Sequence, residues 1–82
     1  MWYFYVLICS DNTLYSGIST NVLKRVVSHN KGNGAKYTRT RRPVRLAYCE
    51  TFDSKSKALK REIEVKNFSR VEKLQLITRG LG

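Results

Sequence analysis

Glu62 is the residue whose position in the sequence points most directly to chemistry. Residues 55–68 predict a helix in which Glu62 and Lys66 fall inside the apolar arc, about 40° and 80° from Ala58. A carboxylate there must be paired, protonated or bound to a cation, because burying a bare charge costs several kcal/mol. Two interpretations stay open: an i,i+4 pair with Lys66 that reaches solvent, or a ligand for a hard divalent cation.

The small number of acidic residues restricts what kind of metal site the chain could build. With six Asp and Glu in total, a cage of several carboxylates is hard to assemble. Mg²⁺ often binds through one or two carboxylates, with water and substrate phosphate as its other ligands. The composition therefore permits one ion held by Glu62.

A second pair of residues, Arg25 and His29, lies one turn apart on a helix predicted over residues 21–30. Both fall on one rim of the stripe that we expect to face the core, which comprises Val22, Leu23, Val26 and Val27. Arginine suits phosphate binding and the charge that develops in phosphoryl transfer, and histidine can orient water or protonate a leaving oxygen. Either residue alone is more often an ordinary surface residue, so the pairing is what favours a functional site.

Tyr5 and Tyr15 lie on two strands predicted over residues 2–9 and 13–18, which a three-residue turn connects. If Cys9 faces Thr13, Tyr5 lies opposite Gly17, and the two tyrosines share one face of the sheet. Strand tyrosines usually pack at the rim of a core. A phenol acts as a base only where cations, such as Arg25 or a metal ion, favour the phenolate.

The charge of the chain favours a nucleic-acid partner. Sixteen Lys and Arg residues oppose six Asp and Glu, which gives a formal net charge of +10. Such a surface attracts phosphate backbones, although small ribosomal proteins are also basic. Residues 36–45 contain five basic residues and no acidic one, and we expect this patch to hold the backbone: Lys36, Arg39, Arg41, Arg42 and Arg45.

The remaining elements complete a small α+β fold. Residues 31–42 are expected to form a loop, followed by a third strand to Phe52 in which Val44, Leu46 and Tyr48 alternate. A capping box at Ser69 and Glu72 opens a last helix that ends at Gly80. We expect its inward residues to be Val71, Leu74 and Ile77. The order β-β-α-β-α-α predicts a three-stranded antiparallel sheet flanked by helices, in one domain over residues 1–82.

Two further features bear on the compartment. Cys9 and Cys49 each lie in an apolar run, and we expect two buried thiols in a reducing cytosol. The apolar run at residues 2–9 is typical of a strand rather than a signal peptide or a membrane span. We therefore expect a cytoplasmic protein without membrane association, and a monomer, although no sequence feature specifies the oligomeric state.

Taken together, these residues resemble the motifs of the GIY-YIG nuclease superfamily, and most closely its small single-domain, YhbQ-like branch. Tyr3-Phe4-Tyr5 and Tyr15-Ser16-Gly17 occupy the places of its two name-giving motifs. Residues 19–29 resemble the helix that carries the family arginine, and residues 58–62 the helix that carries the metal-binding glutamate. Residues 34–39 resemble a loop of the small members. The resemblance covers about residues 2–70.

This resemblance implies a β-β-α-β-α nuclease core with one Mg²⁺ or Mn²⁺ on Glu62. It also implies that Tyr5 or Tyr15 helps to deprotonate the attacking water, that Arg25 binds the scissile phosphate, and that His29 supports the nucleophile or proton transfer. The metal would stabilise the leaving 3′ oxygen. The expected activity is endonucleolytic hydrolysis of nucleic acid, DNA rather than RNA, directed by structure more than by sequence.

The chain also departs from the family pattern. Tyr3 and Phe4 stand where the first motif has Gly and Ile, and Ile18 and Ser19 stand where many members have a lysine. Many members also carry an asparagine well beyond the glutamate, whereas Asn67 is close to it. Two alternatives therefore remain: a non-catalytic nucleic-acid-binding module that keeps the fold, and a protein-interaction or ribosome-associated domain.

Overall fold

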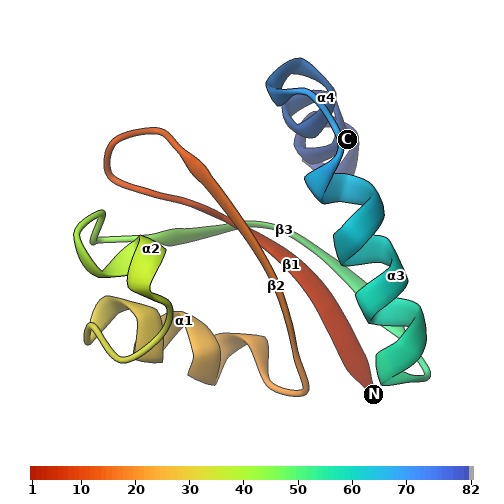
Figure 1. Ribbon diagram of the computed structural model, residues 1–82, viewed down its shortest axis with the longest axis horizontal. Helices are drawn as coiled ribbons and strands as arrows, with labels where there is room; N and C mark the ends of the chain where they lie inside the picture. Colours follow the sequence, from red (N-terminus) through yellow and green to blue (C-terminus); the bar gives the residue numbers. More distant parts are fainter. Residues whose placement is uncertain (82) are drawn as a thin grey trace.

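A computed structural model describes residues 1–81, which form three strands and four helices (Figure 1). The elements, in chain order, are β1 (Trp2–Ile8), β2 (Leu14–Ser19), α1 (Val22–Asn30), α2 (Lys36–Arg39), β3 (Arg45–Phe52), α3 (Lys55–Lys66) and α4 (Arg70–Leu81). The strands form one antiparallel sheet in the order β2-β1-β3. The predicted fold class is confirmed, and the four-residue helix α2 is an addition within the segment expected to be a loop.

The β1–β2 hairpin has the register that the sequence predicts. Tyr5 pairs with Gly17 and Leu7 with Tyr15, so Tyr5 and Tyr15 lie on the same face. The turn closes with a hydrogen bond of 2.8 Å from the Cys9 amide to the Thr13 carbonyl, and Asn12 adopts a left-handed φ of 67°. A turn followed by one left-handed residue is a common three-residue hairpin connection, and asparagine tolerates that conformation.

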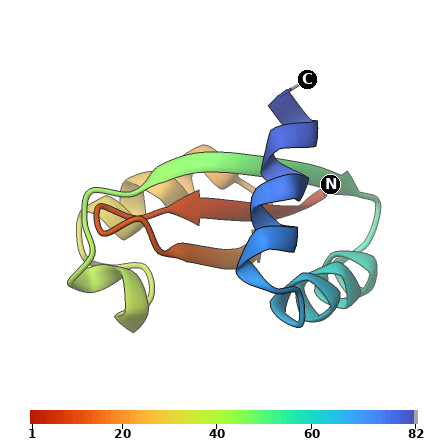
Figure 2. The same cartoon turned by 90° about the horizontal axis from the view of Figure 1, so that it is seen from above.

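The central strand β1 separates two hydrophobic layers. Tyr5 and Leu7 pack with Val22 of α1, whereas Phe4 and Val6 pack with Val65 of α3. Figures 1 and 2 show α1 and α2 on one side of the sheet and α3 and α4 on the other. Because side chains alternate along a strand, a continuous apolar run at β1 supplies both layers.

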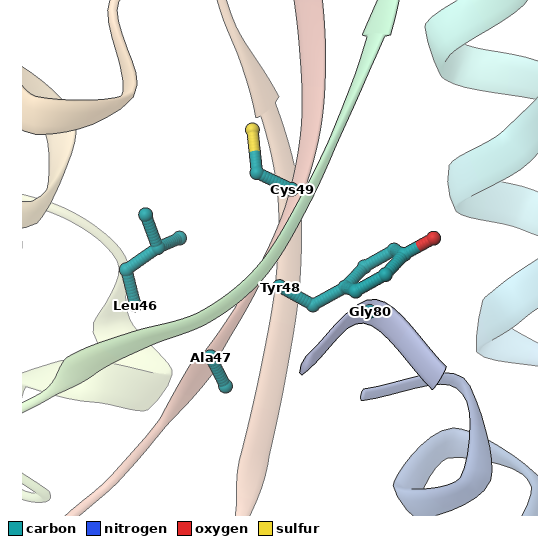
Figure 3. A pocket seen from close by; sticks show the side chains of 5 residues that line it. All are labelled: Leu46, Ala47, Tyr48, Cys49 and Gly80. Carbon is teal, nitrogen blue, oxygen red and sulfur yellow. The ribbon is translucent and has the colours of Figure 1, made fainter. Parts of the chain in front are cut away.

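A bulge in β3 overturns the predicted alternation of its side chains. Val6 pairs with Tyr48 and Leu7 with Leu46, which leaves Ala47 as the extra residue. Leu46 and Cys49 therefore point to one side of β3, and Tyr48 points to the other, toward α4 (Figure 3). Leu46 is exposed rather than alternating with Val44 and Tyr48 in the core, and Cys49 is an exposed thiol rather than a buried one.

The buried faces of α1 and α3 differ from those that apolar periodicity predicts. Leu23 is 75% exposed and Val27 and Ile63 are also exposed. In α1 the fully buried position belongs to His29 instead. The physical reason is that a helix on a three-stranded sheet buries only a narrow stripe, and a histidine with partners on both ring nitrogens can occupy it.

The last helix begins as predicted but is buried along a different stripe. Ser69 and Glu72 form the reciprocal capping box, with bonds of 2.9 and 3.2 Å between each side chain and the other residue's amide. Val71 and Leu74 are exposed, while Leu76 and Ile77 pack on the sheet.

We expected α4 to end at Gly80, but the helix includes Gly80 and extends to Leu81. At Gly80 the helix passes close to the Tyr48 ring. A Cβ at Gly80 would lie 2.6 Å from Cδ1 of Tyr48. Across residues 1–81, the helices are all too short or too polar to traverse a lipid bilayer.

Candidate functional site

The five residues predicted to act together come from four elements, and three of them, Tyr5, Tyr15 and His29, are in direct contact. Tyr5 lies on β1, Tyr15 on β2, Arg25 and His29 on α1, and Glu62 on α3. Burial raises the pKa of both tyrosines, the charge of Arg25 partly opposes that rise, and the charge of Glu62 adds to it. Both charges are therefore close enough to act on both phenol rings, although α1 and α3 lie on opposite sides of the sheet.

Tyr5 is the innermost member of the group. Its side chain is 1% exposed, and its hydroxyl lies 3.1 Å from Nε2 of His29. The ring passes over its cross-strand partner Gly17, where a Cβ would lie 2.6 Å from the Tyr5 hydroxyl oxygen. The glycine of the second motif is therefore needed because a side chain there would displace the phenol of the first.

His29 is fully buried, and its ring contacts fix its tautomer. Nδ1 lies 3.3 Å from the amide nitrogen of Ala35 and 2.8 Å from the hydroxyl of Thr38. The Ala35 amide can only donate, so Nδ1 is the acceptor and the ring proton is on Nε2. The Thr38 hydroxyl has two acceptors in range, Nδ1 and the Ala35 carbonyl. Nε2–H then donates to Tyr5, which leaves the Tyr5 hydroxyl proton free to point elsewhere.

Burial is the largest influence on all three rings. It lowers the pKa of His29, and the positive charge of Arg25 lowers it further, so the imidazole is neutral near pH 7. Burial also raises the pKa of Tyr5 and of Tyr15, and Arg25 only partly opposes this effect. Both phenols are therefore protonated near neutral pH, and a further cation is needed before either can act as a base.

Tyr15 is the more accessible of the two phenols. It is half-buried, its ring meets the edge of His29 at a centroid distance of 5.2 Å, and it stacks on Tyr37 of α2 at 5.9 Å. These contacts hold the ring between the buried imidazole and a more exposed aromatic side chain. Of the two phenols, Tyr15 is therefore the one that water can approach.

Glu62 is largely shielded but is not sealed from solvent. Its side chain is 16% exposed, and its ion-pair partner in the described part of the chain is Lys66, with Nζ 3.7 Å from Oε2. That distance is too long for a strong hydrogen bond. The i,i+4 ion pair with Lys66, which is one of the two interpretations of Glu62, is thus present. At this distance it binds the carboxylate only weakly.

The donor set around Glu62 fits an ion that takes few protein ligands. Within residues 1–81 no three His, Cys, Asp or Glu side chains gather closely enough to enclose a metal. A single accessible carboxylate suits Mg²⁺ or Mn²⁺ that keeps water and phosphate oxygens in its shell, and it does not suit an all-protein cage.

The predicted basic patch divides into residues with different surroundings. Arg41 donates to Asp11 at 3.1 Å and to the Tyr37 carbonyl at 2.8 Å, and Arg42 donates to the carbonyls of Arg39 and Asn30. Both guanidinium groups thus fasten the segment around α2 to the hairpin and to α1. Lys36, Arg39 and Arg45 are exposed on this surface.

Sequence reasoning missed the residues that hold His29 in place. Thr38 is fully buried against the imidazole, and a Cβ at Gly34 would lie 2.2 Å from Nδ1. Both lie in the segment that resembles a loop of the small family members, so this resemblance was the available signal. No local sequence pattern indicates that Thr38 holds in place a histidine nine residues earlier in the chain.

The comparisons with known proteins identify the family of this chain. The family model described as the GIY-YIG catalytic domain matches residues 1–75. A UPF0213 protein of Staphylococcus saprophyticus is 55% identical over 78 residues, with 95% of each chain covered. One from the archaeon Natronomonas pharaonis is 54% identical over 80 residues, covering 98% of this chain and 94% of the relative.

Two solution NMR structures have the same fold. The UPF0213 protein from Bacillus halodurans has a TM-score of 0.61 and 46% identity, with 95% of this chain and 84% of that chain covered. A protein from E. faecalis has a TM-score of 0.64 and 43% identity, with 94% and 82% covered. With a matching family model over most of its length and these relatives, the chain belongs to the GIY-YIG family, among its small UPF0213 proteins.

Proposed function

We propose that this protein is a divalent-metal-dependent endonuclease that hydrolyses phosphodiester bonds of nucleic acid, with DNA as the expected substrate. The observation that supports it is that Tyr5 and Tyr15 both contact the buried His29, while the charges of Arg25 and of the partly exposed Glu62 act on both phenols. Phosphoryl transfer needs these parts: a cation-binding carboxylate, a positive group for the phosphate, and a group that accepts a proton from water.

Each side chain has a distinct part in this proposal. Arg25 holds the scissile phosphate, because guanidinium groups bind phosphate oxygens in a bidentate manner. Tyr15, which water can approach, would accept the proton of the attacking water as a phenolate, after its own phenol proton has been released to solvent. Tyr5 and His29 support Tyr15 from the buried side of the site, and Nε2–H of His29 keeps the Tyr5 hydroxyl in place. Glu62 would hold the divalent ion, which would supply Lewis-acid stabilisation of charge on the phosphate and would favour the phenolate form of a tyrosine.

The surface next to Arg25 can accept a phosphate backbone. A hollow of about 370 Å³ is lined by polar and basic residues at the start of α1, namely Ser19, Thr20, Asn21, Lys24, Arg25 and Ser28. Because these contacts involve phosphate and not base edges, they position a strand without reading its sequence. Cleavage directed by the shape of the substrate is therefore expected.

A plasmid-nicking assay tests the proposal. Wild type is expected to nick supercoiled DNA with Mg²⁺ or Mn²⁺ and not with EDTA, and Glu62→Gln should lose this activity while still binding DNA. Glu64→Gln is the matched control, because it removes the same charge from the same helix at a side chain that is 57% exposed. Equal nicking by wild type and Glu62→Gln would refute the proposal.

One observation favours a second function, a nucleic-acid-binding module without catalysis. The ammonium of Lys66 lies 3.7 Å from Glu62 and partly neutralises the carboxylate that a metal ion would need. If Lys66 blocks metal binding in this way, the wild type should bind DNA with no cleavage in either ion, and Lys66→Ala, which frees the carboxylate, should gain metal-dependent nicking. Nicking by the wild type that depends on Glu62 would exclude this alternative.

A further inference from the structure

A hollow beside the proposed catalytic centre is not explained by phosphate hydrolysis. It has a volume of about 210 Å³ and is lined by residues from β2, α2, α3 and the start of α4: Leu14, Tyr15, Ser16, Tyr37, Lys66 and Lys73. Two of these residues connect the hollow to the proposed catalytic centre, because Tyr15 belongs to that centre and Lys66 pairs with Glu62. Whatever occupies this hollow therefore lies next to the proposed catalytic centre.

Tyr37 gives this hollow a rigid aromatic wall. The ring is 38% exposed, yet it stacks on Tyr15 at a centroid distance of 5.9 Å and an interplanar angle of 24°. The Arg41 guanidinium lies 4.0 Å from its ring centre and also donates to the Tyr37 carbonyl and to Asp11. A side chain held by two neighbours, Tyr15 and Arg41, loses little conformational entropy when a ligand packs against the part of the ring that stays exposed.

The side chains that line the hollow match the chemical groups of a nucleotide. Two phenol rings and Leu14 offer an apolar surface, and two ammonium groups offer positive charge, with no acidic side chain in the lining. A nucleotide has the matching parts, a flat aromatic base and a phosphate. The volume is below the roughly 300 Å³ at which small-molecule sites usually begin, so the occupant is one unit of a longer chain.

We propose that this hollow is a subsite for a single unpaired base adjacent to the phosphate that is cut; this inference rests on the proposed nuclease function and names its substrate class. A base inside a duplex is covered on both faces by its neighbours, so it can pack against a protein ring only after leaving the stack. Substrates that already carry an unpaired base avoid that cost. The protein therefore favours bulged, flapped or single-stranded sites over continuous duplex.

The test uses two DNA duplexes that differ by one unpaired 2-aminopurine, with wild-type protein in EDTA so that no cleavage occurs. The wild type should bind the bulged duplex more tightly and quench its 2-aminopurine fluorescence. Tyr37→Leu should weaken that binding by about 5- to 150-fold, the range that stacking of one base supplies, and abolish the quenching. Tyr37→Phe, which keeps the ring, should behave as wild type.

Binding of the fully paired duplex is the internal control. It should be unchanged in Tyr37→Leu, because that complex is held by phosphate contacts. Equal losses for both duplexes, or no loss for the bulged one, would overturn the subsite. Because no step in this assay requires hydrolysis, a protein that fails to nick DNA can still pass it, and an active nuclease can fail it.

Discussion

Replacing Gly17 with alanine tests how firmly the Tyr5 phenol is held. The new Cβ would lie 2.6 Å from the Tyr5 hydroxyl oxygen and 2.8 Å from Cζ, whereas ordinary contacts begin at 3.4 Å. The hydroxyl would therefore have to move by about 0.8 Å, from the difference of 3.4 and 2.6 Å. Tyr5 is a buried core residue, so this movement is not free.

The expected loss in the free energy of unfolding has two contributions. Overpacking a core typically costs about 1–3 kcal/mol, and losing the bond between Tyr5 and His29 adds roughly 0.5–1.5 kcal/mol. Gly17→Ala should therefore reduce the free energy of unfolding by about 1.5–4.5 kcal/mol. A domain of 82 residues has roughly 4–12 kcal/mol in total, so most of this range leaves a folded protein.

Urea denaturation of four proteins measures this effect: wild type, Gly17→Ala, Tyr5→Phe and the double variant. Removing the hydroxyl removes the shortest contact and the bond to His29, so Gly17→Ala should cost less in the Tyr5→Phe background. A Gly17→Ala change within 0.5 kcal/mol of wild type, or equal costs in both backgrounds, would show that the phenol is not held over this strand.

Three further predictions concern Arg25, Arg41 and His29. Arg25→Ala should reduce nicking by about 10²-fold while leaving DNA affinity nearly intact, and a proportional loss of affinity would contradict its proposed part in the transition state. Arg41→Gln should lower the free energy of unfolding by about 1 kcal/mol because its bonds to Asp11 and Tyr37 are lost, whereas Arg39→Gln should not; equal stabilities would refute the structural assignment. Because burial holds the pKa of His29 below its ordinary value, the unfolded chain binds a proton that the folded chain does not. Stability should then be complete above about pH 6.5 and fall on acidification by up to about 1.4 kcal/mol per pH unit, and a flat urea midpoint between pH 7 and pH 5 would contradict this.

The fold was predictable from local pattern because its hairpin and caps are encoded locally. The three-residue turn set the register that placed Tyr5 opposite Gly17, and the Ser69 capping box set the start of α4. The bulge at Ala47 was not predictable, because it depends on how β3 pairs with a strand some 40 residues earlier. No run of neighbouring residue types signals such a long-range mismatch.

The sequence pattern indicated which candidate residues lie near one another, but not how they pack. Helical spacing brought Arg25, His29 and Glu62 to attention, and strand register placed the tyrosines together. The same periodicity assigned Leu23 to the core and His29 to its rim, and the structure reverses both. Apolar patterning could not reveal that the histidine is buried, since its partner Thr38 comes from a separate segment.

Binding of Mn²⁺, followed through the ring signals of His29, tests the central claim most directly, because this is the chain's one histidine. If Glu62 holds a divalent ion beside the two phenols, substoichiometric Mn²⁺ should broaden the His29 and Tyr15 signals in the wild type and in Glu64→Gln. The same addition should leave both signals sharp in Glu62→Gln. Broadening that persists in Glu62→Gln, or that never appears in the wild type, would contradict a metal site at this carboxylate.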